Sequence, residues 1–122
     1  MNSSLEVTDN QSQAVAKDQT TRVALADIEA NIAHEISFTA GGVLYKSPYT
    51  KYGKPLPKSL DVLTICIITM KNGFSVIGKS APADPQNFNE LLGEKFARED
   101  AIRQLWPLMG YELRERLYRQ NA

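Results

Sequence analysis

The stretch VLTICIITMKNGFSVIGK, residues 62–79, decides the fold that this sequence predicts. Its first half is apolar and β-branched, its end is apolar again, and Asn72-Gly73 stands between the two halves. β-Branched runs favour strands, and Asn-Gly is the strongest short signal for a hairpin because a type I′ turn needs positive φ at two successive residues. The sequence therefore predicts a β-hairpin with a two-residue turn, in which Ile68 lies opposite Ile77.

Both faces of this predicted hairpin are apolar. With that register, one face would carry Leu63, Ile65, Ile67 and Val76, and the other Val62, Cys66, Ile68, Met70 and Ile77. A sheet of this size usually leaves one face to water, so two apolar faces both need cover. The helices of the chain can cover one of them, which leaves the second for the N-terminal helix or for another copy of the protein. A homodimer or a higher homo-oligomer is therefore expected.

A helical pattern precedes the hairpin. Thr20 or Thr21 can cap a short helix whose apolar residues recur at three-to-four spacing: Leu25, Ile28, Ile32 and Ile36. Residues 37–39 are expected to be extended, and residues 43–45 to pair back after a turn at 41–42. Residues 1–20 are polar and bury little apolar surface, so they are expected to form a mobile tail.

A second helical pattern follows the hairpin. Asp84-Pro85 is typical of a helix start, with Asp as N-cap and Pro at the first position. An apolar stripe over residues 88–106 predicts a helix across the sheet, and Ala97 and Ala101 are small enough to let a neighbour approach closely.

Pro107 and Gly110 are expected to interrupt this helix, with a final amphipathic segment over residues 111–119. Trp106 is expected to be a packing anchor at the interruption. The fold class is therefore α+β: residues 21–122 form a single domain with a small antiparallel β-sheet built on a central hairpin, an N-terminal helix, and C-terminal helices packed across the sheet.

The composition excludes several classes of protein. Fourteen Lys+Arg balance fourteen Asp+Glu in 122 residues, which does not fit a polycation that coats a nucleic acid duplex. No apolar run is long enough to span a membrane, and the first residues do not resemble a secretory signal, so a cytoplasmic protein is expected. His34 is the only histidine and Cys66 the only cysteine, and neither stands in a nucleophile or metal-ligand motif. Neither an enzymatic activity, nor a metal site, nor a cofactor is expected; Cys66 is interpreted as a small buried hydrophobe.

The segment 46–58 carries four lysines and two tyrosines among prolines and glycine. It is either a cationic, aromatic flap that contacts phosphates or bases, or a loop kept soluble by its lysines.

Two stretches carry a resemblance to a known family. Residues 64–80, with TICIITMKNGF, and residues 84–113, with DPQNF and WPLMGYEL, resemble the core of a family of small tailed-phage and prophage proteins, the phage gene-product forty-nine family. The resemblance covers roughly residues 62–117. The segment 45–60 looks longer than the usual link in the family.

A weaker similarity is one of layout alone. An antiparallel sheet followed by C-terminal helices is similar to the phage anti-defence sponge proteins that counter Thoeris immunity. This similarity implies binding of cyclic ADP-ribose-type or cyclic oligonucleotide signals between protomers, without cleavage, in the cytoplasm of an infected bacterial host.

Such a nucleotide trap needs an aromatic side chain for the base, amides for its edge and arginines for the phosphates. The candidate ligand-binding residues each have an ordinary alternative role: Phe74 in a core or interface, Asn87 beside a helix start, Arg98 and Arg103 on an ion-paired face, and Arg114 and Arg116 on the polar side of the last segment. Asn72 is assigned to the turn, with ligand contact as the alternative. The competing hypothesis is a phage accessory factor that docks on a host or phage protein through the hairpin face or the segment 45–60, without a small ligand.

Overall fold

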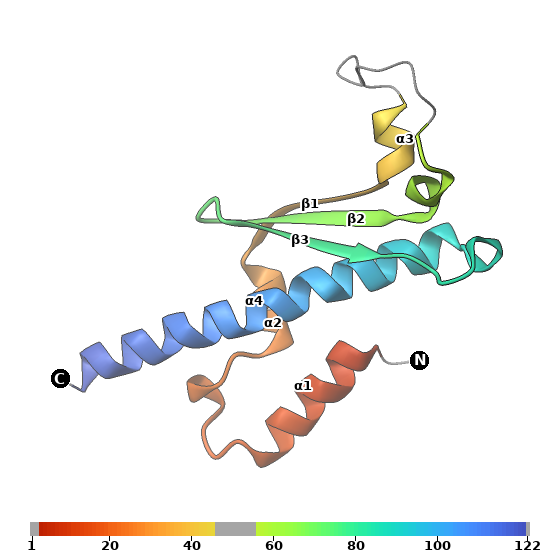
Figure 1. Ribbon diagram of the computed structural model, residues 1–122. Coiled ribbons are helices and arrows are strands. Elements are labelled where there is room, and N and C mark those ends of the chain that lie inside the picture. The colour runs from red at the N-terminus through yellow and green to blue at the C-terminus, as the bar shows by residue number, and fades with distance from the viewer. Residues whose placement is uncertain (1–2, 46–55, 122) are drawn as a thin grey trace.

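The computed structural model of the chain describes residues 3–45 and 56–121. Its elements, in chain order, are α1 (Ser4–Val15), the short 3-10 turn η1 (Gln19–Thr21), α2 (Leu25–Ala30), β1 (Ile32–Thr39), α3 (Ala40–Leu44), η2 (Lys58–Val62), β2 (Thr64–Met70), β3 (Ser75–Ser80), η3 (Pro85–Asn87) and α4 (Glu90–Gln120). The strands form one antiparallel sheet in the order β1-β2-β3, and α4 crosses one face of it (Figure 1). The predicted α+β class is confirmed.

The predicted hairpin is present, but its register differs by one residue. Ile68 pairs with Val76, and Ile67 pairs with Ile77. The turn has three residues, because the Met70 N–H donates to the Phe74 carbonyl at 2.8 Å and the Gly73 N–H to the Met70 carbonyl at 2.8 Å. Among the described residues only Gly73 has a positive φ, of 90°, so the type I′ prediction was wrong.

The one-residue slip exchanges the two faces of β3. Val76 points to the covered side of the sheet, and Ile77 points to the other. The division of β2 was predicted correctly: Cys66, Ile68 and Met70 are buried, and the residues between them are half-buried.

The covered side of the sheet, called here the inner face, is the core of the protein. Side chains of β2 and β3 pack there against one stripe of α4: Cys66, Ile68, Met70 and Val76 against Ala97, Ala101, Ile102 and Leu105. Gly78 lies so close to α4 that a Cβ atom would overlap the Ala97 carbonyl and the Ala101 amide. The predicted close approach at Ala97 and Ala101 is therefore confirmed, and β3 is the neighbour that makes it.

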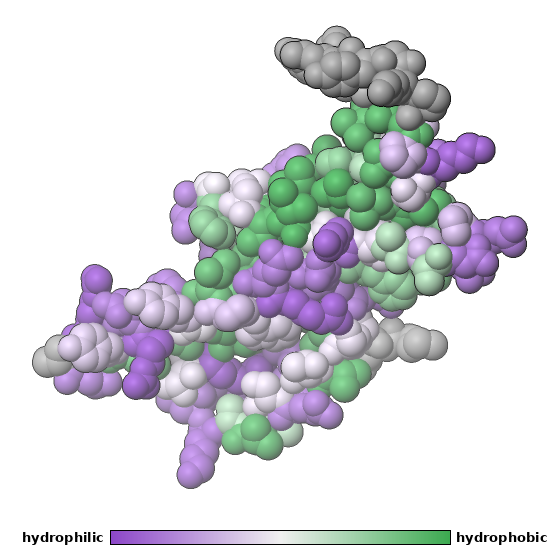
Figure 2. Space-filling view, viewed as in Figure 1, coloured by the Kyte–Doolittle hydropathy of each residue, from purple (hydrophilic) through white to green (hydrophobic). Residues whose placement is uncertain are grey.

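The opposite side, called here the outer face, carries three cross-strand rows. These are Ile36–Ile67–Ile77, Phe38–Ile65–Lys79 and His34–Thr69–Ser75. Ile36 is 49% exposed and Ile77 is 60% exposed. α1, α2 and α4 all lie on the inner side of the sheet (Figure 1). Figure 2 shows apolar residues gathered over the strands and α3, in contrast to the polar C-terminal half of α4.

The N-terminal segment differs from the mobile tail expected over residues 1–20. Ser3 caps α1 in a reciprocal capping box with Glu6, and Leu5 is only 4% exposed. The Ser4 hydroxyl donates to Glu99 of α4 at 3.0 Å. A mobile tail was expected because this segment has no apolar stripe. The helix is held in place instead by its N-cap, by one buried leucine and by a contact with a residue far away in the sequence.

The helix expected to extend to Ile36 ends much earlier. α2 stops at Ala30, and Ile32 and Ile36 belong to β1, where Ile36 pairs with Ile67. Residues 37–39 are extended as predicted, but residues 40–44 form α3 and do not pair back. The spacing of the apolar residues over 32–36 fits either a helix or a strand. The segment forms a strand because it pairs with the free edge of β2.

Nor does α4 break at Pro107. It runs for 31 residues through both Pro107 and Gly110, so the predicted interruption was wrong. Leu105 is buried in the core on the turn before Pro107, and the Trp106 indole N–H donates to the Val23 carbonyl at 2.8 Å, which confirms Trp106 as an anchor. This packing offsets the free-energy cost of the backbone hydrogen bond that proline cannot make. The helix also begins later than predicted, at Glu90 with Asn89 as N-cap, because Asp84-Pro85 opens η3 instead.

Two further findings bear on function. Most of the lysine- and tyrosine-rich segment, residues 46–55, lies outside the described residues. Within the described part of the chain, none of the helices has the length and apolarity needed to cross a membrane.

Candidate functional site

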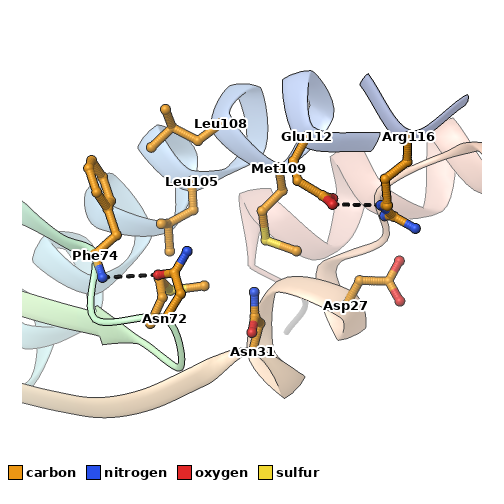
Figure 3. Close-up of a pocket in the computed structure, with 10 residues that line it drawn as sticks. Asp27, Asn31, Asn72, Phe74, Leu105, Leu108, Met109, Glu112 and Arg116 are labelled. Atoms are coloured by element: carbon orange, nitrogen blue, oxygen red, sulfur yellow. Dashed lines mark hydrogen bonds and ion pairs between the residues drawn. The ribbon is translucent and has the colours of Figure 1, made fainter. Parts of the chain in front are cut away.

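A groove of about 430 Å³ opens where the tip of the hairpin, α2 and α4 meet (Figure 3). We call it the tip groove; ten residues line it: Asp27, Asn31, Met70, Asn72, Phe74, Leu105, Leu108, Met109, Glu112 and Arg116. Its volume falls within the range of small-molecule sites, about 300–1,000 Å³. Four of the lining side chains are aliphatic or methionine, so part of its wall is apolar.

The hairpin turn places an aromatic ring at the rim of the tip groove. Phe74 directly follows Gly73, and the residue is 55% exposed. Its backbone N–H donates to the Asn72 side-chain oxygen at 3.0 Å, which orients the Asn72 amide (Figure 3). The turn therefore positions a ring and an amide together, and both of the roles considered for Asn72 remain compatible with its place.

A second amide comes from the junction of α2 and β1. Asn31 is the C-cap residue of α2, and its carbonyl accepts from the Lys71 N–H at 2.9 Å, which ties this junction to the hairpin turn. In Figure 3 the Asn31 and Asn72 side chains stand on the side of the tip groove opposite α4. Two carboxamides can present both donors and acceptors to a ligand edge.

Three charged side chains complete the tip groove. Glu112 binds the Arg116 Nε at 2.6 Å, one helical turn apart. The Asp27 carboxylate accepts from the Ala24 N–H at 2.8 Å and so helps to cap α2. Two carboxylates and one guanidinium give the tip groove a formal charge of −1, and the Glu112 contact leaves the two Nη groups of Arg116 without a described partner. An anionic group would therefore be held at the Nη side of Arg116 only.

The structure brings together two of the six residues predicted for a ligand site, Phe74 and Arg116. Asn87 lies in η3 and lines a separate hollow of about 180 Å³, so it does not stand at the start of α4. Arg114 lines another hollow, of about 420 Å³, with Trp106.

The other two predicted residues are ion-paired. Arg98 joins α4 to Glu35 of β1 at 3.1 Å and to Glu29 of α2 at 3.4 Å. Arg103 binds Glu99 and the Ser4 hydroxyl, and so fastens α1 to α4. Both arginines thus have the ordinary alternative role, that of an ion-paired face.

Sequence reasoning did not propose the other seven lining residues for a ligand site: Asp27, Asn31, Met70, Leu105, Leu108, Met109 and Glu112. No local motif marks them, because the tip groove forms only when the hairpin tip, α2 and α4 come together. Cys66 is buried, and burial raises the pKa of its thiol, as expected for a small buried hydrophobe. No group of three His, Cys, Asp or Glu side chains within residues 3–45 and 56–121 is arranged to hold a metal ion.

A family model described as "Phage protein (N4 Gp49/phage Sf6 gene 66) family" matches residues 23–117. The chain belongs to this family. The match begins at residue 23, well before the 62–117 span of the resemblance, and it includes every residue of the tip groove. Helix α1 precedes the matched span of the Gp49/gene 66 family. No curated protein and no solved structure matches the chain.

Proposed function

We propose that this phage protein binds a nucleotide-like small molecule in the tip groove and does not convert it chemically. One observation carries the proposal: an exposed ring, two carboxamides and an arginine line a single groove of ligand size. The ring of Phe74 would stack on a base, Asn31 and Asn72 would bond its edge, and the Nη groups of Arg116 would hold a phosphate. These are the three recognition elements that a nucleotide trap needs.

The biological role proposed for this binding is sequestration of a host-defence signal. The sheet followed by a C-terminal helix supports it, since sponge proteins that hold cyclic ADP-ribose-type or cyclic oligonucleotide signals share that layout. Binding without turnover is supported by the carboxylates of the tip groove, since Glu112 already binds Arg116 and Asp27 already caps α2. One protomer forms this groove, so the ligand would not need a site between protomers.

Binding is tested by calorimetry and thermal shift with adenosine, AMP, cyclic ADP-ribose and cyclic dinucleotides. Ligand at 100 times its Kd stabilises the folded protein by about 2.7 kcal/mol, which is readily seen as a shift in Tm. Phe74→Ala should weaken binding about 5- to 150-fold, the worth of one stacked base. Arg116→Gln should weaken binding of the phosphorylated ligands about tenfold or more and leave adenosine unchanged.

The ion pair of the tip groove provides a sharper test. Glu112→Gln removes a negative charge beside Arg116, so phosphorylated ligands should bind a few-fold more tightly. The matched control is Glu115→Gln, since Glu115 forms the same i,i+4 pair with Arg119 at 3.0 Å outside the tip groove. Absence of a Tm shift with every nucleotide, or equal effects of the two glutamine substitutions, would contradict the proposal.

The charge of the tip groove favours a second candidate. An apolar wall beside a net charge of −1 also fits a host or phage protein segment that carries an apolar anchor followed by Lys or Arg. For such a partner Glu112→Gln should weaken binding, the opposite sign to that expected for a nucleotide. The same pair of variants therefore distinguishes the two candidates.

A further inference from the structure

The outer face of the sheet is a second feature of the molecule, and it is independent of the tip groove. Five of its nine side chains are apolar: Ile36, Phe38, Ile65, Ile67 and Ile77. We infer that two copies of this chain pack through their outer faces, about a two-fold axis that runs parallel to β2 between the two sheets.

Helices α1, α2 and α4 all lie on the inner side of the sheet and do not cover the outer face. α4 covers the inner face, and α1 packs on α4, where Leu5 is buried and Ser4 binds Glu99. α2 joins the same side through the ion pair between Glu29 and Arg98. Helix α2, which corresponds to the predicted N-terminal helix, therefore lies on the inner side. It cannot cover the outer face, as that helix was expected to do.

The arrangement of side chains favours a second copy as the occupant. A two-fold axis parallel to β2 places β1 of one protomer over β3 of the other. The row Ile36–Ile67–Ile77 then packs against the same row of the partner, which runs in the opposite order. Ile36 therefore faces the partner's Ile77, and Ile67 faces the partner's Ile67. Apolar side chains meet apolar side chains along the whole central row, as in the interior of a β-sandwich.

The charged side chains of the outer face are compatible with the same axis. Lys79 is the only lysine or arginine in the three rows, and they contain no carboxylate. The axis sets Lys79 against the partner's Phe38, where the ammonium can lie on the ring, and keeps the two lysines apart. An axis perpendicular to the strands would instead set Ile65 against the partner's Thr69, with fewer apolar contacts. Three short strands make a small interface, so the dimer is expected to dissociate at micromolar concentrations.

The experiment is sedimentation velocity of the full chain over about 1–100 µM. The wild type should pass from monomer to dimer, and Ile77→Lys should remain a monomer at every concentration. The control is Leu91→Lys, because Leu91 is 76% exposed on α4, away from the sheet, and this variant should dimerise like the wild type. Unchanged circular dichroism would show that each variant is folded.

A mixing experiment tests the axis itself. Ile36→Asp and Ile77→Lys should each be monomeric, and an equimolar mixture should form a dimer, because residue 36 of one copy faces residue 77 of the other. A wild type that is monomeric at 100 µM, a dimer that persists in Ile77→Lys, or a mixture that stays monomeric would each overturn the inference.

Discussion

The two faces of the sheet are built from the same strands, yet only one of them is a protein core. Ile68 on the inner face is fully buried, whereas Ile77 on the outer face is 60% exposed. Both side chains are isoleucines in adjacent strands, so hydrophobicity does not explain the difference. The partner surface does: α4 presents Ala97 and Ala101 to the inner face, where β3 contributes Gly78. Small residues on both sides let a helix and a strand come close enough to exclude water.

The comparison also separates two kinds of site. The tip groove lies at the end of the covered side, where α4 continues beyond the hairpin tip and α2 closes the gap. The outer face instead presents a row of apolar side chains, Ile36, Ile67 and Ile77, across three strands. The first suits a compact ligand with few polar groups, and the second suits another apolar surface.

The largest expected effect comes from a substitution that disrupts the packing of α4 on the inner face. Gly78→Val would place a branched side chain into the Ala97 carbonyl and the Ala101 amide, which are backbone atoms that cannot turn aside. We expect a loss of more than about 3 kcal/mol in the free energy of unfolding, or no folded protein at all. Urea denaturation followed by circular dichroism measures it. Stability within about 1 kcal/mol of the wild type would show that α4 does not rest on β3 as closely as described.

A pair of truncations compares the two faces directly. Ile68→Ala should cost about 2–5 kcal/mol, because Ile68 has 0% exposure and its removal leaves a cavity. Ile77→Ala should cost less than about 1 kcal/mol when measured at a concentration where the protein is monomeric, because its side chain is largely in water already. Equal costs in urea denaturation at low protein concentration would mean that the outer face is covered within the protomer.

The smallest expected effect comes from a substitution that stabilises α4, the helix that covers the inner face. Gly110 lies inside α4, and a Cβ atom there would meet nothing within 4 Å. Gly110→Ala should therefore stabilise the protein by about 0.5–1 kcal/mol, since alanine loses less backbone freedom in a helix. The midpoint of urea unfolding should rise with an unchanged slope. A fall in the midpoint would indicate that the helix needs glycine at this position.

Several features could be predicted because they depend on neighbouring residues. The Asn72-Gly73 turn, the β-branched run before it and the small pair Ala97 and Ala101 led to a hairpin under a helix, and this arrangement is confirmed. The register could not be predicted, because it depends on whether one or two turn residues take positive φ. Only Gly73 does, and the loop gains one residue.

The candidate site was only partly predictable for a related reason. Phe74 and Arg116 could be proposed as single residues from their types. Their meeting depends on α4 running straight through Pro107, which the sequence indicated as an interruption. Asn31 and Asp27 reach the tip groove only because α2 ends early and gives way to β1.

Local chemistry was therefore enough to predict α2, the β2–β3 hairpin and α4, and the presence of two apolar strand surfaces. Those properties follow from backbone preferences and side-chain spacing within a few residues. Three-dimensional packing alone decided which surface α4 covers, which residues line the tip groove, and whether 32–36 is a helix or a strand. Such choices depend on contacts between segments far apart in the chain, whose free energy outweighs the small local preferences of either segment.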